Sequence, residues 1–169
     1  LFYMSWNLTM SRHLRYASIA LAFLFPSIAL AEQESQIALS LGAFEVFDDN
    51  TAAEVGVEYR FAPQSSIFGL IPTLGATLTS DGGYWGYAGV RYDIYLNANW
   101  ILTPNFAIAA YEQGGGVDLG YDMEFRTGAE LAYQFNDKSR LGLGLYHLSN
   151  GDIGENNPGA ESLILSYSF

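Results

Sequence analysis

Residues 140–149 read Arg-Leu-Gly-Leu-Gly-Leu-Tyr-His-Leu-Ser, residues 161–169 read Glu-Ser-Leu-Ile-Leu-Ser-Tyr-Ser-Phe, and together they decide the fold. Side chains alternate between the two faces of a β-strand, so Leu141, Leu143 and Leu145 share a face with His147 and Ser149. In the second stretch Glu161 shares a face with the following leucines and aromatic residues. The polar residues between the stretches predict a hairpin loop, which places three polar side chains on two otherwise apolar strand faces.

The same alternation recurs along the chain and predicts eight strands. Their expected ranges are 36–47, 53–61, 70–79, 84–102, 106–113, 123–135, 140–148 and 161–169. The fourth strand is unusually long, and we expect it to bend. Short polar or Pro-containing segments separate the strands, among them Thr103-Pro104-Asn105 and residues 136–139, and we interpret both as tight turns.

The two faces of each strand differ in a way that favours a membrane barrel. In residues 123–135 one face carries Phe125, Leu131 and Tyr133, whereas the other carries charges of both signs: Glu124, Arg126 and Glu130. A narrow barrel can pair such charges inside, while lipid covers the apolar outside and closure satisfies every backbone group. We therefore predict an all-β fold, an eight-stranded antiparallel transmembrane β-barrel of the bacterial outer membrane.

A soluble β-sandwich is the alternative interpretation of this pattern, with apolar faces meeting in a core. The barrel is preferred because arginines and carboxylates alternate in matched positions and because tyrosine, glycine and aromatic residues are abundant. In addition, Tyr167-Ser168-Phe169 is similar to the C-terminal signal that outer-membrane barrels present to their assembly machinery.

The N-terminal residues read as a targeting segment rather than as part of the fold. Arg12, His13 and Arg15 precede an apolar stretch, and Ala29-Leu30-Ala31 forms a small-x-small cleavage site. We assign residues 1–31 to a secretory signal peptide and residues 32–169 to the barrel. An uncleaved membrane anchor is the alternative, and translation can begin at Met4 or Met10.

Charge and cysteine content exclude several classes of function. Without residues 1–31 the chain has 5 basic residues, since Arg12 and Arg15 are lost from 7, and it keeps all 18 acidic residues. This strongly acidic balance argues against nucleic-acid binding. The absence of cysteine excludes a disulfide framework.

Strand parity predicts where the polar residues lie. Eight strands place both ends of the barrel in the periplasm, so the turn at 136–139 is periplasmic and the loop from Ser149 to Ala160 is outside. His147, Ser149 and Glu161 then face lipid at the level of the outer leaflet, which in Gram-negative bacteria is lipopolysaccharide.

These three residue types suit nucleophilic catalysis. A serine nucleophile needs a base within hydrogen-bond reach, and the base needs an orienting acid. We assign Ser149 as the nucleophile, His147 as the base, Glu161 as the acid and Asn150 as a candidate oxyanion donor. The alternative is that they are ordinary interfacial polar residues, although polar groups facing lipid carry a cost of roughly 1–4 kcal/mol.

His147-Leu148-Ser149-Asn150, followed by Asn157-Pro158-Gly159-Ala160-Glu161 and an aromatic strand, resembles the lipid A 3-O-deacylase (PagL) family. The resemblance implies a serine esterase that removes the ester-linked 3-O-acyl chain from lipid A without a cofactor. It also implies the same roles for the histidine, serine and glutamate, with Asn150 in the oxyanion role. Rival functions are a non-enzymatic structural or adhesin barrel, and an acyltransferase or phospholipase acting on phospholipid.

Other polar features receive simpler interpretations. The acids of the expected outer loops are solvated or, less simply, hold divalent cations that bridge lipid phosphates: Asp48, Asp49, Asp81, Asp118 and Asp122. Expected ion pairs in the lumen involve Arg91, Arg126, Glu54, Glu58 and Glu130. Gly114-Gly115-Gly116 lacks the context of a phosphate-binding loop. His147 is the only histidine after residue 31, so a multi-histidine metal site is excluded.

Overall fold

A computed structural model describes residues 34–48 and 50–169, so the predicted signal peptide lies outside the described residues. The strands are β1 (Gln36–Phe44), β2 (Ala52–Arg60), β3 (Ile71–Thr79), β4 (Tyr84–Arg91), β5 (Ile94–Tyr95), β6 (Trp100–Glu112), β7 (Met123–Gln134), β8 (Arg140–Ser149) and β9 (Ala160–Ser168). One 3-10 turn, η1, spans Ser65–Ile67. No helix in this part of the chain is long and apolar enough to cross a membrane.

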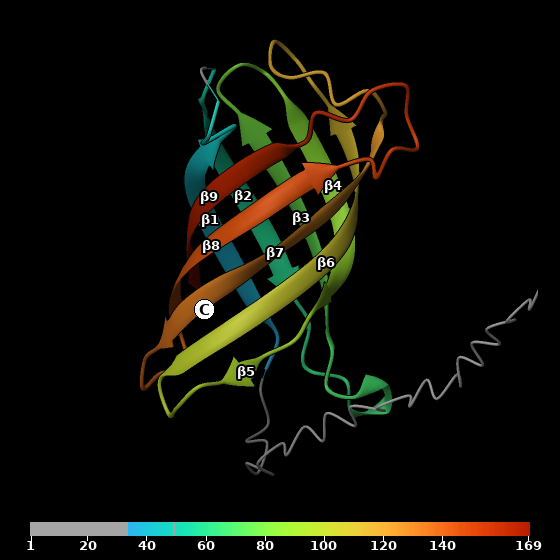
Figure 1. Ribbon diagram of the computed structural model, residues 1–169. Helices are drawn as coiled ribbons and strands as arrows, with labels where there is room; N and C mark the ends of the chain where they lie inside the picture. The colour runs from blue at the N-terminus through green and yellow to red at the C-terminus, as the bar shows by residue number, and fades with distance from the viewer. Residues whose placement is uncertain (1–33, 49) are drawn as a thin grey trace, which may run out of the picture. The chain divides into compact units, whose positions relative to one another are not determined.

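The strands close into a barrel (Figure 1). Antiparallel neighbours follow the order β4-β3-β2-β1-β9-β8-β7-β6, and β4 also pairs with β6, which joins the two ends of the sheet. β5 pairs with β6 for only two residues and lies beyond the β4–β6 pairing that closes the wall. Eight strands therefore form the wall, which confirms the predicted fold class. A two-sheet sandwich is excluded, since this single sheet has no free long edge.

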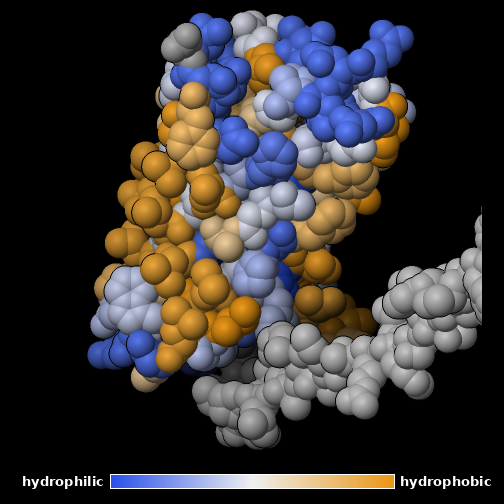
Figure 2. Space-filling model, in the orientation of Figure 1, coloured by the Kyte–Doolittle hydropathy of each residue, from blue (hydrophilic) through white to orange (hydrophobic). Residues whose placement is uncertain are grey.

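The wall is apolar outside and polar inside. Outward residues such as Leu143, Leu165 and Val55 are exposed, whereas the inward Glu58, Arg91 and Glu130 are buried. Figure 2 shows hydrophobic side chains along the wall and hydrophilic side chains gathered at the loop end drawn at the top. This distribution of side chains is the reverse of that in a soluble protein and fits a wall surrounded by lipid.

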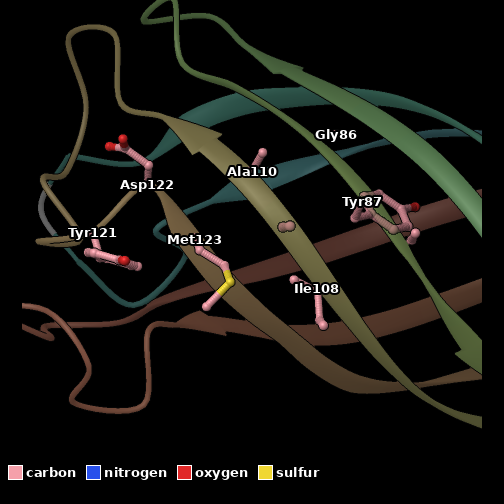
Figure 3. A pocket seen from close by; sticks show the side chains of 9 residues that line it. Gly86, Tyr87, Ile108, Ala110, Tyr121, Asp122 and Met123 are labelled. Carbon is pink, nitrogen blue, oxygen red and sulfur yellow. The ribbon is translucent and has the colours of Figure 1, made fainter.

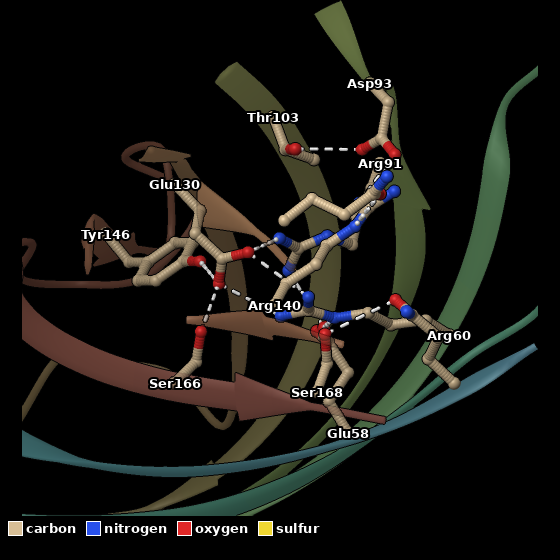
Figure 4. A network of polar contacts seen from close by, with 12 residues as sticks. Glu58, Arg60, Arg91, Asp93, Thr103, Glu130, Arg140, Tyr146, Ser166 and Ser168 are labelled. Carbon is tan, nitrogen blue, oxygen red and sulfur yellow. Dashed lines mark hydrogen bonds and ion pairs between the residues drawn. The ribbon is translucent and has the colours of Figure 1, made fainter. Parts of the chain in front are cut away.

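An ion cluster fills the middle of the barrel (Figure 4). Arg91 bridges Glu58 at 2.8 Å and Glu130 at 2.9 Å, and Arg60 bridges the same two carboxylates at 2.7 and 3.0 Å. The expected pairing of Arg91, Glu58 and Glu130 is thus confirmed. Because each charge has two partners of opposite sign, four buried charges are neutralised together.

Two of the five residues for which we expected lumen ion pairs form none among the described residues. Arg126 and Glu54 form no ion pair within 4 Å in the described part of the chain. Instead the Arg126 guanidinium lies over the ring of Tyr146 at 3.6 Å and near that of Tyr87 at 4.8 Å. Aromatic rings therefore replace a carboxylate as the partner of this cation.

A hydrophobic cluster fills the barrel beneath the loop end. Its buried members include Phe44, Trp85, Tyr111, Leu119 and Leu148, with the rings of Phe44 and Trp85 5.0 Å apart. The hydrophobic cluster and the ion cluster thus occupy different parts of the barrel interior.

The long fourth strand and the turn at Thr103-Pro104-Asn105 were predicted wrongly. β4 ends at Arg91, the chain turns at residues 96–99, and Pro104 lies inside β6 opposite Ala129. Proline lacks an N–H, but its carbonyl accepts from Tyr92 N, so the missing donor faces the break between β4 and β5. A proline at this interruption costs little free energy, so Pro104 can lie within β6 and does not mark a turn.

Candidate active site

His147 and Glu161 lie directly opposite each other on β8 and β9. His147 Nδ1 is 2.9 Å from Glu161 Oε1. A carboxylate can only accept, so Nδ1 carries the proton in this pair and Nε2 keeps its lone pair. The pairing therefore fixes the tautomer that a general base requires. Both side chains are partly exposed on the outer face, at 43% and 31%.

Ser149 ends β8 two residues after His147 and so shares its outward face. It lies opposite Phe125 of β7 and is partly exposed. Its hydroxyl has no hydrogen-bond partner within the described ranges, so His147 is bonded to Glu161 but not to Ser149. Catalytic contacts of this kind often tighten only once substrate is bound.

Gly159 lies against the free edge of the histidine ring. A Cβ at this position would be 2.6 Å from His147 Cε1 and 3.2 Å from Nε2, and the backbone φ is +70°. Both the space and the conformation therefore require glycine. Sequence reasoning assigned no role to Gly159, although a Pro-Gly pair directly before a strand could have drawn attention to a tight backbone approach.

Asn150 points inward, away from the three outer residues. Its side chain is fully buried and donates to Leu119 O at 2.6 Å and Asn156 O at 2.7 Å. Its backbone N–H donates to Asn157 Oδ1 at 3.0 Å. In this structure Asn150 thus ties the 150–159 loop to the loop that precedes β7, and its N–H groups are engaged there.

A shallow depression of about 600 Å³ lies on the wall of β4, β6 and the start of β7 (Figure 3). Small residues form its floor and larger ones its border: Gly86, Ala88, Ala110, Ile108, Tyr121 and Met123. Sequence reasoning missed it, although small residues at outward strand positions, where leucine or valine is usual in this chain, were a signal.

Strand register connects this depression with Ser149. Ser149 is opposite Phe125, Phe125 is opposite Ile108, and Ile108 is opposite Ala88. Three steps of about 4.8 Å place Ala88 about 14 Å from Ser149 along the hydrogen-bonding direction. The strands are tilted (Figure 1), so a row along the hydrogen-bonding direction crosses the wall obliquely. The site therefore combines a Ser-His-Glu group with an apolar track leading away from it.

The described residues contain no group of three or more His, Asp and Glu side chains placed to hold a metal ion. Within the site, His147 Nδ1 is already bonded to Glu161. The arrangement is therefore that of an acid-base pair beside a hydroxyl group.

Several solved structures share this architecture. The outer membrane enzyme PagL aligns at TM-score 0.62 and 18% identity, over 79% of this chain and 98% of that one. Designed transmembrane β-barrels align at 0.58 and 10% identity, over 82% and 98%. Neisserial surface protein A aligns at 0.54 and 13% identity, over 79% and 94%. At these identities the similarity shows the fold alone.

Among curated proteins none matches the chain. The family model described as lipid A 3-O-deacylase (PagL) matches residues 54–169, which include most of β2, all of β3 to β9 and all of the candidate site. The chain therefore belongs to the lipid A 3-O-deacylase (PagL) family.

Proposed function

We propose that this protein is a serine esterase that hydrolyses the 3-O-acyl ester of lipid A, and that Ser149, His147 and Glu161 are its catalytic triad. The observation that carries the proposal is the 2.9 Å contact between His147 Nδ1 and Glu161 Oε1 on the outer wall, with Ser149 on the same face. Membership of the PagL family supports lipid A as the substrate.

In the first step Ser149 Oγ attacks the ester carbonyl carbon and His147 Nε2 accepts the hydroxyl proton. The Glu161 carboxylate stabilises the imidazolium that forms. Collapse of the tetrahedral intermediate breaks the bond to the sugar oxygen, which receives the proton from Nε2. Water then attacks the acyl-enzyme by the same route and releases a 3-hydroxy fatty acid. All of these steps use groups of this chain and water, without a cofactor.

The proposal includes Asn150 as donor to the oxyanion, through its backbone or side-chain N–H. Those N–H groups bond to Asn157, Leu119 and Asn156 in the substrate-free protein. The role therefore requires that one of these bonds be exchanged when the negative charge develops.

We further propose that the loop end faces the outside of the cell and that the site meets the outer leaflet of the outer membrane. A lipid diffusing in that leaflet then reaches Ser149 from the side. The row from Ser149 to Ala88 descends along the wall, and the depression around Ala88 and Ala110 suits an acyl chain. Two outward aromatic residues, Tyr167 of β9 and Phe169 directly after it, are proposed as the contact for barrel assembly machinery.

A serine-directed fluorophosphonate tests the nucleophile. The refolded protein should gain the mass of one adduct, located on Ser149 by peptide mapping, and Ser149→Ala should gain none. His147→Ala should label at least 100-fold more slowly, since the hydroxyl then lacks its base. Equal labelling of Ser149→Ala would exclude the triad. Hydrolysis of phospholipid but not of lipid A by a labelled protein would favour the phospholipase alternative.

A further inference from the structure

The loop end of the barrel carries a second polar site, separate from the triad. A cavity of about 500 Å³ lies among three loops, and its walls include Glu45, Thr51, Ser80, Asp81 and Gly116. Glu45 was expected inside the first strand, but β1 ends at Phe44 and Glu45 adopts a positive φ of 55°. The sequence analysis assigned no role to the Glu45 carboxylate.

The Glu45 carboxylate is buried and has no hydrogen-bond or ion-pair partner among the described residues. The residue is only 5% exposed, and its Oε2 is enclosed. Burial together with Asp48 and Asp81 raises the pKa of Glu45. A buried carboxylate that has acidic neighbours and no donor is costly, so the position needs either a proton or a cation to compensate.

Asp81 supplies a second carboxylate oxygen at the same cavity. Its Oδ1 accepts from Thr79 Oγ1 and Gly83 N, whereas no described residue donates to its Oδ2. The 114–116 glycine run wraps around this residue: a Cβ on Gly116 would be 2.5 Å from Asp81 Oδ2. Because Gly116 has no side chain, it leaves room for the Oδ2 atom of Asp81.

No basic side chain is available to neutralise these acids. The four loops at this end, residues 45–51, 80–83, 113–122 and 150–159, contain no lysine, arginine or histidine. The barrel arginines lie in the strands: Arg60 and Arg91 belong to the ion cluster, Arg140 pairs with Asp93, and Arg126 lies over the rings of Tyr87 and Tyr146. Compensation for Glu45 and Asp81 must therefore come from outside the chain.

We propose that this cavity is a binding site for one hard divalent cation such as Ca²⁺, held by the carboxylates of Glu45 and Asp81. Two carboxylates suffice because Ca²⁺ accepts neutral oxygens for its other positions. Hydroxyl oxygens of Thr51 and Ser80, backbone carbonyls and water provide these at the cavity wall. The bound cation would join the loop after β1 to the loops that flank β4 and β6.

One consequence rests on the proposed function. Lipid A carries phosphate groups, and an end of the barrel with only acidic loops repels them. A cation at Glu45 and Asp81 would neutralise these two carboxylates and give a phosphate a cationic partner beside the loops. The cation site itself requires no hydrolysis, so it can be tested separately.

The test uses Tb³⁺ as a luminescent substitute for Ca²⁺, on refolded Ser149→Ala protein in detergent without lipid. Trp85 and Tyr111 pack against Phe44, the residue before Glu45, and therefore serve as the excitation donors. We expect saturable binding of one Tb³⁺, displaced by Ca²⁺ but not by the same concentration of Na⁺. Glu45→Gln and Asp81→Asn should each weaken binding at least 10-fold.

Glu155→Gln is the matched control, because it removes the same charge from an exposed position of another loop. It should change the affinity less than twofold. Equal weakening of Tb³⁺ binding by all three variants would indicate a diffuse acidic surface and would overturn the proposal. Unsaturable binding, or a Glu45→Gln variant that binds like its parent, would do the same and would favour a protonated Glu45. Because lipid and hydrolysis are absent, neither result depends on the esterase proposal.

Discussion

At the scale of single residues, the contact between Glu161 and His147 carries the proposed chemistry. Glu161→Gln keeps the size of the side chain but lets its amide donate to Nδ1, which favours the wrong tautomer of the ring. We expect kcat to fall about 10²- to 10⁴-fold, as for other triads. Initial rates on lipid A will measure this, with Glu155→Gln as a control for lost charge. A loss below threefold would show that Glu161 does not orient the base.

Gly159 should matter for activity more than for stability. Gly159→Ala forces a methyl group to within 2.6 Å of His147 Cε1, so the ring must move. Such a displacement of the His147 ring should lower kcat about 10²-fold. Gly82→Ala is a matched control, because Gly82 also has a positive φ, +91°, but nothing lies within 4 Å of its Cβ position.

Both glycine variants should lose a similar free energy of unfolding, about 1–2 kcal/mol, from backbone strain. Urea unfolding measures this cost and separates it from the kinetic effect. If Gly82→Ala lowers kcat as much as Gly159→Ala does, the close approach to His147 is not what matters.

At the scale of strands, the apolar track on β4, β6 and β7 should determine how well the acyl chain is held. Ala88→Leu and Ala110→Leu fill the floor of the depression with larger side chains. We expect KM for lipid A to rise about 10-fold, with a smaller change for a short-chain ester that does not reach Ala88. Ala53→Leu, on the outward face of β2, is the control for added bulk on the wall. Equal effects on long and short esters would contradict this role.

Strand alternation was predictable from sequence because lipid outside and charge inside impose a period of two on every strand. The positions of the β4 and β6 ends were not, since Pro104 signals a turn locally but sits where its absent N–H is not needed. His147 and Glu161 were predictable as neighbours from hairpin pairing. The approach of Gly159 to the ring, and the inward direction of Asn150, depend on loop paths that the sequence does not encode by periodicity.

At the scale of the whole molecule, the ion cluster should contribute strongly to barrel stability. Glu130→Leu leaves Arg60 and Arg91 with only Glu58 between them. We expect a loss of about 3–5 kcal/mol in the free energy of unfolding. Adding Arg91→Leu restores the balance to one arginine and one glutamate and should recover part of the loss. Urea unfolding in detergent will measure both, and a double variant less stable than Glu130→Leu would contradict the charge-balance explanation.

The position of Ser149, His147 and Glu161 on the outer wall and the family match both support the proposed hydrolysis of a lipid in the surrounding leaflet. The most direct test is mass spectrometry of lipid A after incubation with the refolded protein and with Ser149→Ala. The proposal predicts a loss equal to one 3-hydroxyacyl chain, taken from position 3, with the wild-type protein only. An unchanged lipid A in the presence of a folded barrel, or the same loss with Ser149→Ala, would contradict it.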